Sequence, residues 1–275
     1  MKQYDIKVIG LDLDGTVFDD QKRISPRTIA AIQAAAEKGV AVLPATGRFL
    51  AGLPESFVGL KGVRYALTSN GAAVTELASG RRLVSRMLPD DTAAEVMRVL
   101  SRFDCVANAY IEGHGFASDA IYRHLDEWYQ GTGFAGYIRT FFHPDLTPLE
   151  IVQAHPGAVE KISALFHTAS EREQAVSALA GLPCLVCSSL SNNIEIGAEG
   201  ADKGEGLLAL AKALGYGAEN VMACGDSGND LAMIRKAGLG VAMGNASPAV
   251  KQAADYITLS NNDDGVAAAI EKFVL

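Results

Sequence analysis

The sequence predicts an α/β protein: a doubly wound, parallel-sheet, Rossmann-like core that carries an inserted α+β cap. Short apolar runs alternate with amphipathic segments in the first and last thirds of the chain, which is typical of β-α-β units. Between about residues 84 and 190 this alternation gives way to strand-like segments in a different order. Polar residues follow several of the apolar runs directly, as functional residues do at the strand ends of open sheets.

The core elements are predicted from apolar runs and from the capping, glycine and proline residues at their ends. Ser25 is expected to cap a helix with Pro26 in its first turn, and Gly39 ends it. Pro44 lacks a backbone donor, so we expect it at the end of its strand. Strands are expected over 6–11, 40–45, 65–72, 221–226 and 239–246, and helices over 204–214 and 227–238.

The middle of the chain is expected to form a self-contained cap. We assign residues 1–83 and 190–275 to the catalytic core and 84–189 to the cap. Ser170 and Glu173 fit a capping box at the start of a cap helix. Cap strands are expected at 84–88, 105–111, 137–142, 160–166 and 182–189, and further helices at 90–102 and 119–130.

Composition limits the classes of function. The chain has 275 residues, 49% of them hydrophobic, and a formal net charge of -8. This charge argues against nucleic acid and anionic membranes as partners but not against small anionic substrates. The sequence shows neither a signal peptide nor a membrane helix. The lone CxxC of Cys184 and Cys187 is expected to be a pair of buried thiols, and a reducing cytoplasm is the expected compartment.

Carboxylates gather at the predicted strand ends. Asp12 and Asp14 follow the first strand and Asp226 ends a later one, with Asp230 shortly after it. The carboxyl ends of parallel strands lie at one edge of a sheet, so these groups should converge there. Oxygen ligands at this density favour Mg²⁺. Asp12 could then act as nucleophile and Asp14 as general acid and base. Thr46 and Lys203 could supply a donor and a cation to a phosphoryl group.

Four motifs in order resemble those of the haloacid dehalogenase superfamily of phosphatases. They are Asp12-Leu13-Asp14-Gly15-Thr16, Thr46-Gly47-Arg48, Lys203-Gly204 and Gly225-Asp226-Ser227-Gly228-Asn229-Asp230. The insert before Lys203, with Ser69-Asn70-Gly71 ahead of it, is similar to the large α/β cap of the Cof-type branch. The likeness covers essentially the whole chain.

The resemblance implies a role for each matched residue. Asp12 would be the nucleophile, Asp14 the acid and base, and Thr46 and Lys203 would hold the phosphoryl group. Mg²⁺ would be held by the Asp12 carboxylate, the Asp14 backbone carbonyl and the Asp226 carboxylate. Asp230 would support the metal. Substrate-binding positions would be Gly47, Arg48, Asn70 and Asn229, although Arg48 could instead fix its loop and Asn70 could serve only the turn before Gly71.

The sequence therefore predicts a cytoplasmic, Mg²⁺-dependent phosphomonoester hydrolase, a monomer or a homodimer. Its substrate would be a small phosphate ester, such as a sugar phosphate, pyridoxal phosphate or flavin mononucleotide. Two alternatives stay open: a sugar phosphomutase with the same phosphoaspartate chemistry, and a catalytically silent protein that binds phosphate esters. The GTGFAG stretch at 131–136 follows a helical segment rather than a strand, so we interpret it as a cap loop and not as a dinucleotide site.

Overall fold

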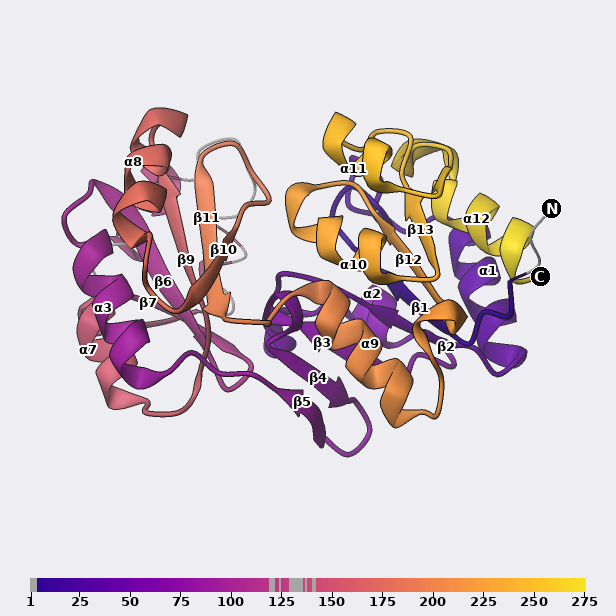
Figure 1. Ribbon diagram of the computed structural model, residues 1–275, viewed down its shortest axis with the longest axis horizontal. Coiled ribbons are helices and arrows are strands. Elements are labelled where there is room, and N and C mark those ends of the chain that lie inside the picture. Colours follow the sequence, from indigo (N-terminus) through magenta and orange to yellow (C-terminus); the bar gives the residue numbers. More distant parts are fainter. Residues whose placement is uncertain (1–3, 119–121, 124, 129–135, 137, 140–141) are drawn as a thin grey trace. The chain divides into compact units, whose positions relative to one another are not determined.

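The chain forms two compact units. The computed structural model describes residues 4–118, 122–123, 125–128, 136, 138–139 and 142–275, with 142–145 described by their backbone alone. The first unit comprises Met1–Gly47, Leu53–Ser85 and Asp202–Leu275. The second comprises Arg48–Gly52 and Arg86–Ala201. Figure 1 shows both units, each built around its own sheet.

A five-stranded parallel sheet is the centre of the first unit. Its order is β14-β13-β12-β1-β2, so the chain starts in the middle and winds outward in both directions. The strands are β1 (Val8–Leu11), β2 (Ala41–Pro44), β12 (Val221–Gly225), β13 (Leu239–Ala242) and β14 (Tyr256–Ile257). Pro44 is the last residue of β2, as expected. The predicted doubly wound core is confirmed.

Helices cover both faces of this sheet (Figure 1). They are α1 (Pro26–Glu37), α2 (Glu55–Val58), α9 (Lys203–Ala213), α10 (Leu231–Lys236), α11 (Pro248–Ala253) and α12 (Gly265–Phe273). Ser25 caps α1 by accepting a hydrogen bond from the Thr28 amide at 3.0 Å. The helix expected over 227–238 is shorter, because a 3-10 turn over Gly228–Asp230 precedes α10. A small antiparallel sheet completes the unit, with β3 (Tyr65–Thr68), β4 (Ala73–Glu76) and β5 (Arg82–Ser85).

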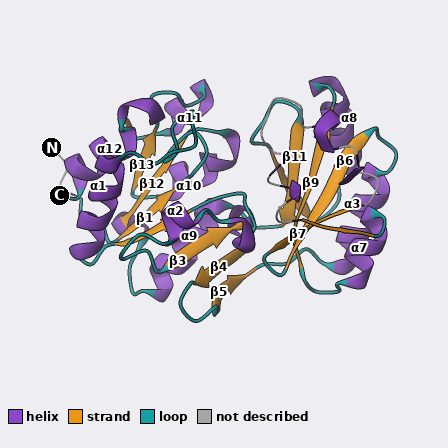
Figure 2. Ribbon diagram, turned by 180° about the vertical axis from the view of Figure 1, so that it is seen from behind, coloured by secondary structure: helices purple, strands orange, loops and turns teal. Residues whose placement is uncertain are grey.

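The second unit is a six-stranded sheet with helices packed on one face (Figure 2). Its order is β10-β11-β9-β6-β7-β8. The strands are β6 (Cys105–Ile111), β7 (His114–Ser118), β8 (Phe142–Asp145), β9 (Val159–Phe166), β10 (Cys184–Cys187) and β11 (Asn193–Ala198). Helices α3 (Asp90–Leu100), α7 (Pro148–Ala154) and α8 (Ala169–Leu179) enclose an apolar core with that face, and a short helix α5 (Leu125–Trp128) lies elsewhere in the unit.

Several expectations for this unit differ from the structure. The strand expected at 84–88 is β5 in the small sheet of the first unit, and Arg48–Gly52, expected in the core, belongs to the second unit. The second unit runs to Ala201 rather than 189, because β11 pairs with β10 and β9. Its first boundary lies after Ser85 rather than after 83. Helix α8 is capped by Thr168, not Ser170: Thr168 Oγ1 accepts from the Glu171 amide at 3.2 Å, and Glu171 accepts from the Thr168 amide at 2.9 Å.

Cys184 and Cys187 lie on β10 and are half-buried, not buried as expected. Three positions apart on one strand, their side chains point to opposite faces of the sheet. They therefore do not face each other as a redox pair would.

Of the helix expected over 119–130, residues 122–123 and 125–128 are described and are helical. Of the strand expected over 137–142, residues 138–139 are helical instead, and Phe142 begins β8. Apart from Gly136, the GTGFAG stretch lies outside the described residues.

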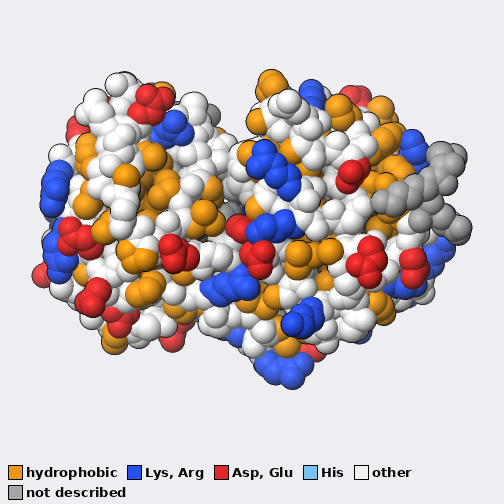
Figure 3. Space-filling model, viewed as in Figure 1, with side chains coloured by type: hydrophobic (Ala, Val, Ile, Leu, Met, Phe, Trp, Pro, Cys, Tyr) orange, Lys and Arg blue, Asp and Glu red, His pale blue; other side chains and the backbone are white. Residues whose placement is uncertain are grey.

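None of the helices in the described part of the chain has the length and apolar composition that a membrane crossing requires. On the face shown in Figure 3, lysine and arginine side chains are interspersed with acidic ones.

Candidate active site

The candidate site lies at the carboxyl edge of the first unit's sheet. In the register of the sheet, Leu11 of β1 pairs with Cys224 of β12 on one side and Pro44 of β2 on the other. Asp12 follows Leu11, Asp226 follows β12, and Thr46 comes two residues after Pro44. The parallel topology therefore brings three segments that are distant in sequence to one edge, at the point where the strand order reverses.

Lys203 is buried between two carboxylates. Its side chain is 0% exposed, and its Nζ lies 2.7 Å from Asp12 Oδ1 and 2.7 Å from Asp230 Oδ1. Asp202 starts the helix that carries Lys203 by accepting from the Glu205 amide at 2.8 Å. Removing one member of a buried group of ion pairs leaves an uncompensated charge, so the Lys203 ammonium is held in place by its two carboxylates. Lys203 is therefore a buried residue of the site and not an ordinary surface lysine.

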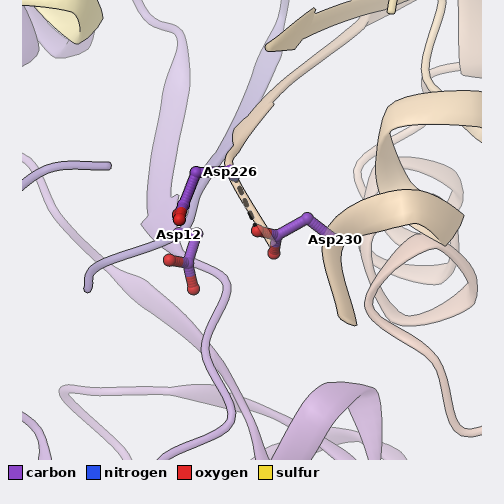
Figure 4. Close-up of side chains that lie close together, drawn as sticks. All are labelled: Asp12, Asp226 and Asp230. Atoms are coloured by element: carbon purple, nitrogen blue, oxygen red, sulfur yellow. Dashed lines mark hydrogen bonds between the residues drawn. The ribbon is translucent and has the colours of Figure 1, made fainter. Parts of the chain in front are cut away.

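Asp230 has both carboxylate oxygens engaged. Its Oδ1 accepts from Lys203, and its Oδ2 accepts from the amides of Asp226 and Ser227 at 2.9 and 3.0 Å. Figure 4 shows the hydrogen bond to Asp226 and the side chains of Asp12, Asp226 and Asp230 lying close together. Asp230 therefore shapes the turn after β12 and holds Lys203 in place.

The electrostatics of the site leave negative charge in excess. Oxygens of Asp12, Asp226 and Asp230 lie within 4.8 Å of one another. Burial raises the pKa of Asp12 well above its usual range and Asp230 and Asp226 raise it further, while Lys203 opposes the rise. Burial and then Asp230 raise the pKa of Asp226 to about 6, whereas the hydrogen bond from Thr16 lowers it. Burial alone would lower the pKa of Lys203, but Asp12 and Asp230 raise it, so the ammonium stays charged.

Asp14 lies beside this group rather than in it. Its Oδ1 accepts from Lys22 Nζ at 2.8 Å in a largely exposed pair, and its charge raises the pKa of Asp226. Gly15, which follows Asp14, has a φ of +85°, and a Cβ there would lie 2.7 Å from Asp226 Oδ2. Only glycine fits this approach. Thr16 Oγ1 then donates to Asp226 Oδ1 at 3.0 Å.

The remaining predicted residues divide between the two units. Thr46, buried at 2% exposure, accepts through its carbonyl from the Asn70 amide at 3.1 Å. Asn70 has a left-handed backbone (φ 56°), as the turn interpretation requires, and its Oδ1 accepts from Asn229 Nδ2 at 3.3 Å. Gly47 ends its segment of the first unit, and Arg48 begins a segment that belongs to the second.

Several contacts of the site were not predicted. The side chains are Thr16 and Lys22, described above, Ser227, which donates to Asn229 Oδ1 at 2.9 Å, and Asn245, which donates to the Gly15 carbonyl at 2.8 Å. Thr16 and Ser227 lie inside the sequence motifs, and that position could have indicated their role in the site. Nothing in the local sequence around Lys22 or Asn245 indicates that they contact the site.

The donor set fits a hard divalent cation. Asp12, Asp226, Asp230 and Lys203, when ionised, carry a net charge of -2 in a largely buried space. All the free ligand atoms are oxygens, which suits Mg²⁺. Because the oxygens of Asp230 are already hydrogen-bonded, Asp12 and Asp226 are the better placed direct ligands.

Comparisons with known proteins show the family to which the chain belongs. The model of the haloacid dehalogenase-like hydrolases matches residues 9–270. The chain is 35% identical to the 5-amino-6-(5-phospho-D-ribitylamino)uracil phosphatase YcsE of Bacillus subtilis, over 98% of this chain and 97% of that protein. It is 28% identical to the pyridoxal phosphate phosphatase YbhA of Escherichia coli, over 96% and 97%.

A solved structure extends the likeness to the whole fold. A haloacid dehalogenase-like hydrolase from Bacteroides thetaiotaomicron, 29% identical, superposes with a TM-score of 0.80 over 97% of this chain and 99% of that one. The chain therefore belongs to the haloacid dehalogenase-like hydrolases and is an enzyme of their phosphatase class.

Proposed function

We propose that this enzyme hydrolyses a small phosphate monoester through a phosphoaspartate on Asp12, with Mg²⁺ as cofactor. The observation that carries the proposal is the position of Asp12, held by a buried lysine beside Asp226 at the sheet's carboxyl edge. Aspartate is a known nucleophile in phosphoryl transfer. A nucleophile must be ionised and aimed, and the 2.7 Å contact with Lys203 favours both.

Asp12 would attack phosphorus in line with the leaving oxygen. Asp14, on the partly exposed side, would protonate that oxygen as the P–O bond breaks. It would then take a proton from the water that hydrolyses the phosphoaspartate, returning Asp12 as a carboxylate and releasing phosphate. Lys203, the Thr46 hydroxyl and amides of the glycine-containing turns would stabilise the charge on the equatorial oxygens.

The residues proposed to hold Mg²⁺ are Asp12, Asp226 and the backbone carbonyl of Asp14. When bound, the ion would neutralise the excess negative charge and polarise the phosphoryl group. Asp230 would act on the site indirectly, through Lys203 and through the amides of Asp226 and Ser227. Thr16 would orient Asp226 through its hydrogen bond.

The substrate class is a small phosphorylated metabolite. The two relatives named above act on a ribitylaminouracil phosphate and on pyridoxal phosphate. These two substrates have only the phosphate monoester in common. The comparison therefore supports phosphate monoesters as a class and no single compound. We place the contacts that distinguish leaving groups in the second unit, the proposed cap.

A phosphate-release assay over a panel of monoesters, with Mg²⁺ or with EDTA, tests the proposal. Release should require Mg²⁺ and should fall below detection in Asp12→Asn, whose fold is checked by circular dichroism. Appearance of an isomeric sugar phosphate without free phosphate would identify a mutase instead. Near-normal hydrolysis by a folded Asp12→Asn variant would refute the nucleophile.

A further inference from the structure

The turn between β3 and β4 of the first unit, Ser69–Gly71, has a left-handed backbone at all three of its residues. The φ angles are 50° at Ser69, 56° at Asn70 and 95° at Gly71. Such angles suit glycine, are tolerated by asparagine and are unfavourable for serine. Strained residues of this kind persist only where the surrounding structure holds them, and they cluster at functional sites. We call these three residues the 69–71 turn.

The 69–71 turn connects the segment after β2 with the turn after β12. The Asn70 amide donates to the Thr46 carbonyl at 3.1 Å, and Asn70 Oδ1 accepts from Asn229 Nδ2 at 3.3 Å. The other end of the Asn229 amide is held as well, because its Oδ1 accepts from the Ser227 hydroxyl at 2.9 Å. Through one residue, two segments of the site are therefore hydrogen-bonded to the same turn.

A third segment packs against this turn at Gly71. A Cβ at Gly71 would overlap the carbonyl oxygen of Asp202, and a Cβ at Gly206 would lie 3.1 Å from the Gly71 Cα. The turn and the start of α9 thus approach each other through two glycines, and a larger residue at either position would push them apart. Because Lys203 follows Asp202 directly, this contact sets the position of the helix start that carries Lys203.

We infer that the 69–71 turn sets the positions of these three segments relative to one another and that Asn70 is a positioning residue of the reaction, an inference that rests on the proposed function. The segments carry Thr46, Lys203 and, in the turn after β12, Asp226 and Asp230. The left-handed backbone directs the amide of Asn70 to one segment and its side chain to another. That geometry accounts for a strained turn at this place.

The contacts of Asn70 favour positioning over direct contact with substrate. Its side-chain oxygen already accepts from Asn229, and its backbone amide already donates to Thr46. At 5% exposure Asn70 offers little surface to a ligand, whereas Asn229 is half-buried and offers more. Asn70 therefore acts on the reaction through the groups that it holds, and Asn229 is the one that its side chain holds.

A double-mutant cycle with Asn70→Gly and Asn229→Ala tests this inference. Glycine removes the side-chain acceptor but tolerates the left-handed backbone, so the melting temperature should stay within about 3 °C of the wild type. For p-nitrophenyl phosphate and for pyridoxal phosphate, kcat should fall about three- to tenfold with KM unchanged, as for one lost hydrogen bond. In the Asn229→Ala background the same replacement should change kcat by less than about twofold.

The matched control is Glu112→Gly. Glu112 lies in the turn between β6 and β7 of the second unit and also has a left-handed backbone, with a φ of 49°, but it has no proposed role in the reaction. This variant should keep the wild-type kcat and KM, with or without Asn229→Ala. Asn70→Ala replaces Asn70→Gly in the cycle if the glycine variant does not fold.

Three results would overturn the inference and leave the proposed function standing. They are wild-type kcat in folded Asn70→Gly, a raised KM at wild-type kcat, and losses from Asn70→Gly and Asn229→Ala that multiply in the double variant. The last two would show that Asn70 acts on the substrate independently of Asn229. Absence of phosphate release by the wild type from every monoester would instead refute the proposed function.

Discussion

Replacing Lys203 by methionine should cause a large loss of stability, and the structure supplies its own control. Lys203 contacts two carboxylates at 2.7 Å with a side chain that is 0% exposed. Lys236 contacts Asp202 and Glu205 at 2.8 Å each, but its side chain is 35% exposed. The two lysines thus have the same number of partners at nearly the same distance and differ in burial.

Burial decides the expected magnitudes. Without Lys203, two carboxylates are left unpaired in the interior, which costs about 3–5 kcal/mol of unfolding free energy. Without Lys236, two solvent-screened pairs are lost, together worth at most about 1–2 kcal/mol. The pKa of Asp12 should rise further in Lys203→Met, so that variant should regain part of its stability as the pH falls and Asp12 becomes protonated.

Urea unfolding of both methionine variants at neutral pH, in EDTA, measures the difference. Phosphate release then adds a second readout, because Lys203→Met should lose activity and Lys236→Met should keep it. Equal losses of unfolding free energy in the two variants would show that burial of Lys203 is not what makes its ion pairs important.

Three further predictions concern the carboxylates around Lys203. Asp226 has a folded pKa of about 6 against an ordinary value of 3.8, so the folded state binds its proton more tightly. In EDTA this group should therefore lower the unfolding free energy by about 3 kcal/mol as the pH rises from about 4 to above 6; a wild-type curve parallel to that of Asp226→Asn would contradict this. Thr16→Val removes the hydrogen bond that lowers the pKa of Asp226. Because more of Asp226 would then be protonated near pH 6, half-maximal activity there should need several-fold more Mg²⁺. An unchanged Mg²⁺ requirement would exclude the orienting role of Thr16. In Asp14→Asn, kcat/KM should fall by about 10²–10⁴ for alkyl phosphates and much less for p-nitrophenyl phosphate, whose leaving group needs no proton; equal losses would argue against Asp14 as the general acid.

Topology made the carboxylate group predictable from sequence. Asp12 and Asp226 stand directly after strands, and parallel strands end at a common edge whatever their separation along the chain. Lys203 was harder, because a lysine at a helix start is ordinarily exposed. Its burial depends on Asp12 and Asp230, which lie 191 and 27 residues away, and no local pattern carries that information.

The second unit shows where local patterns are ambiguous. The stretch Thr168-Ala-Ser170-Glu171-Arg-Glu173 contains two overlapping capping boxes, and the position where β9 ends selects the one that begins at Thr168. Strand β11 alternates Asn193, Ile194, Glu195 and Ile196. That alternation is a strand pattern, but its buried polar positions resemble an exposed face, and nothing local indicates that the segment pairs with β9 and β10 in the second unit.

The pairing of charges connects fold to chemistry at this site. A second lysine beside Asp226 would reduce the net charge of the group from -2 to -1, yet among the described residues the side chain that donates to Asp226 is a threonine. The charge of Asp12 and Asp230 is therefore partly compensated by Lys203, whereas Asp226 has no cation of its own in the part of the chain that the structure describes. If lysines of the chain neutralised every carboxylate of the site, the fold would be more stable. Asp12 and Asp226 would then have no excess negative charge with which to bind a divalent cation. In the function proposed above, this excess of negative charge, which destabilises the metal-free protein, would attract Mg²⁺ to Asp12 and Asp226.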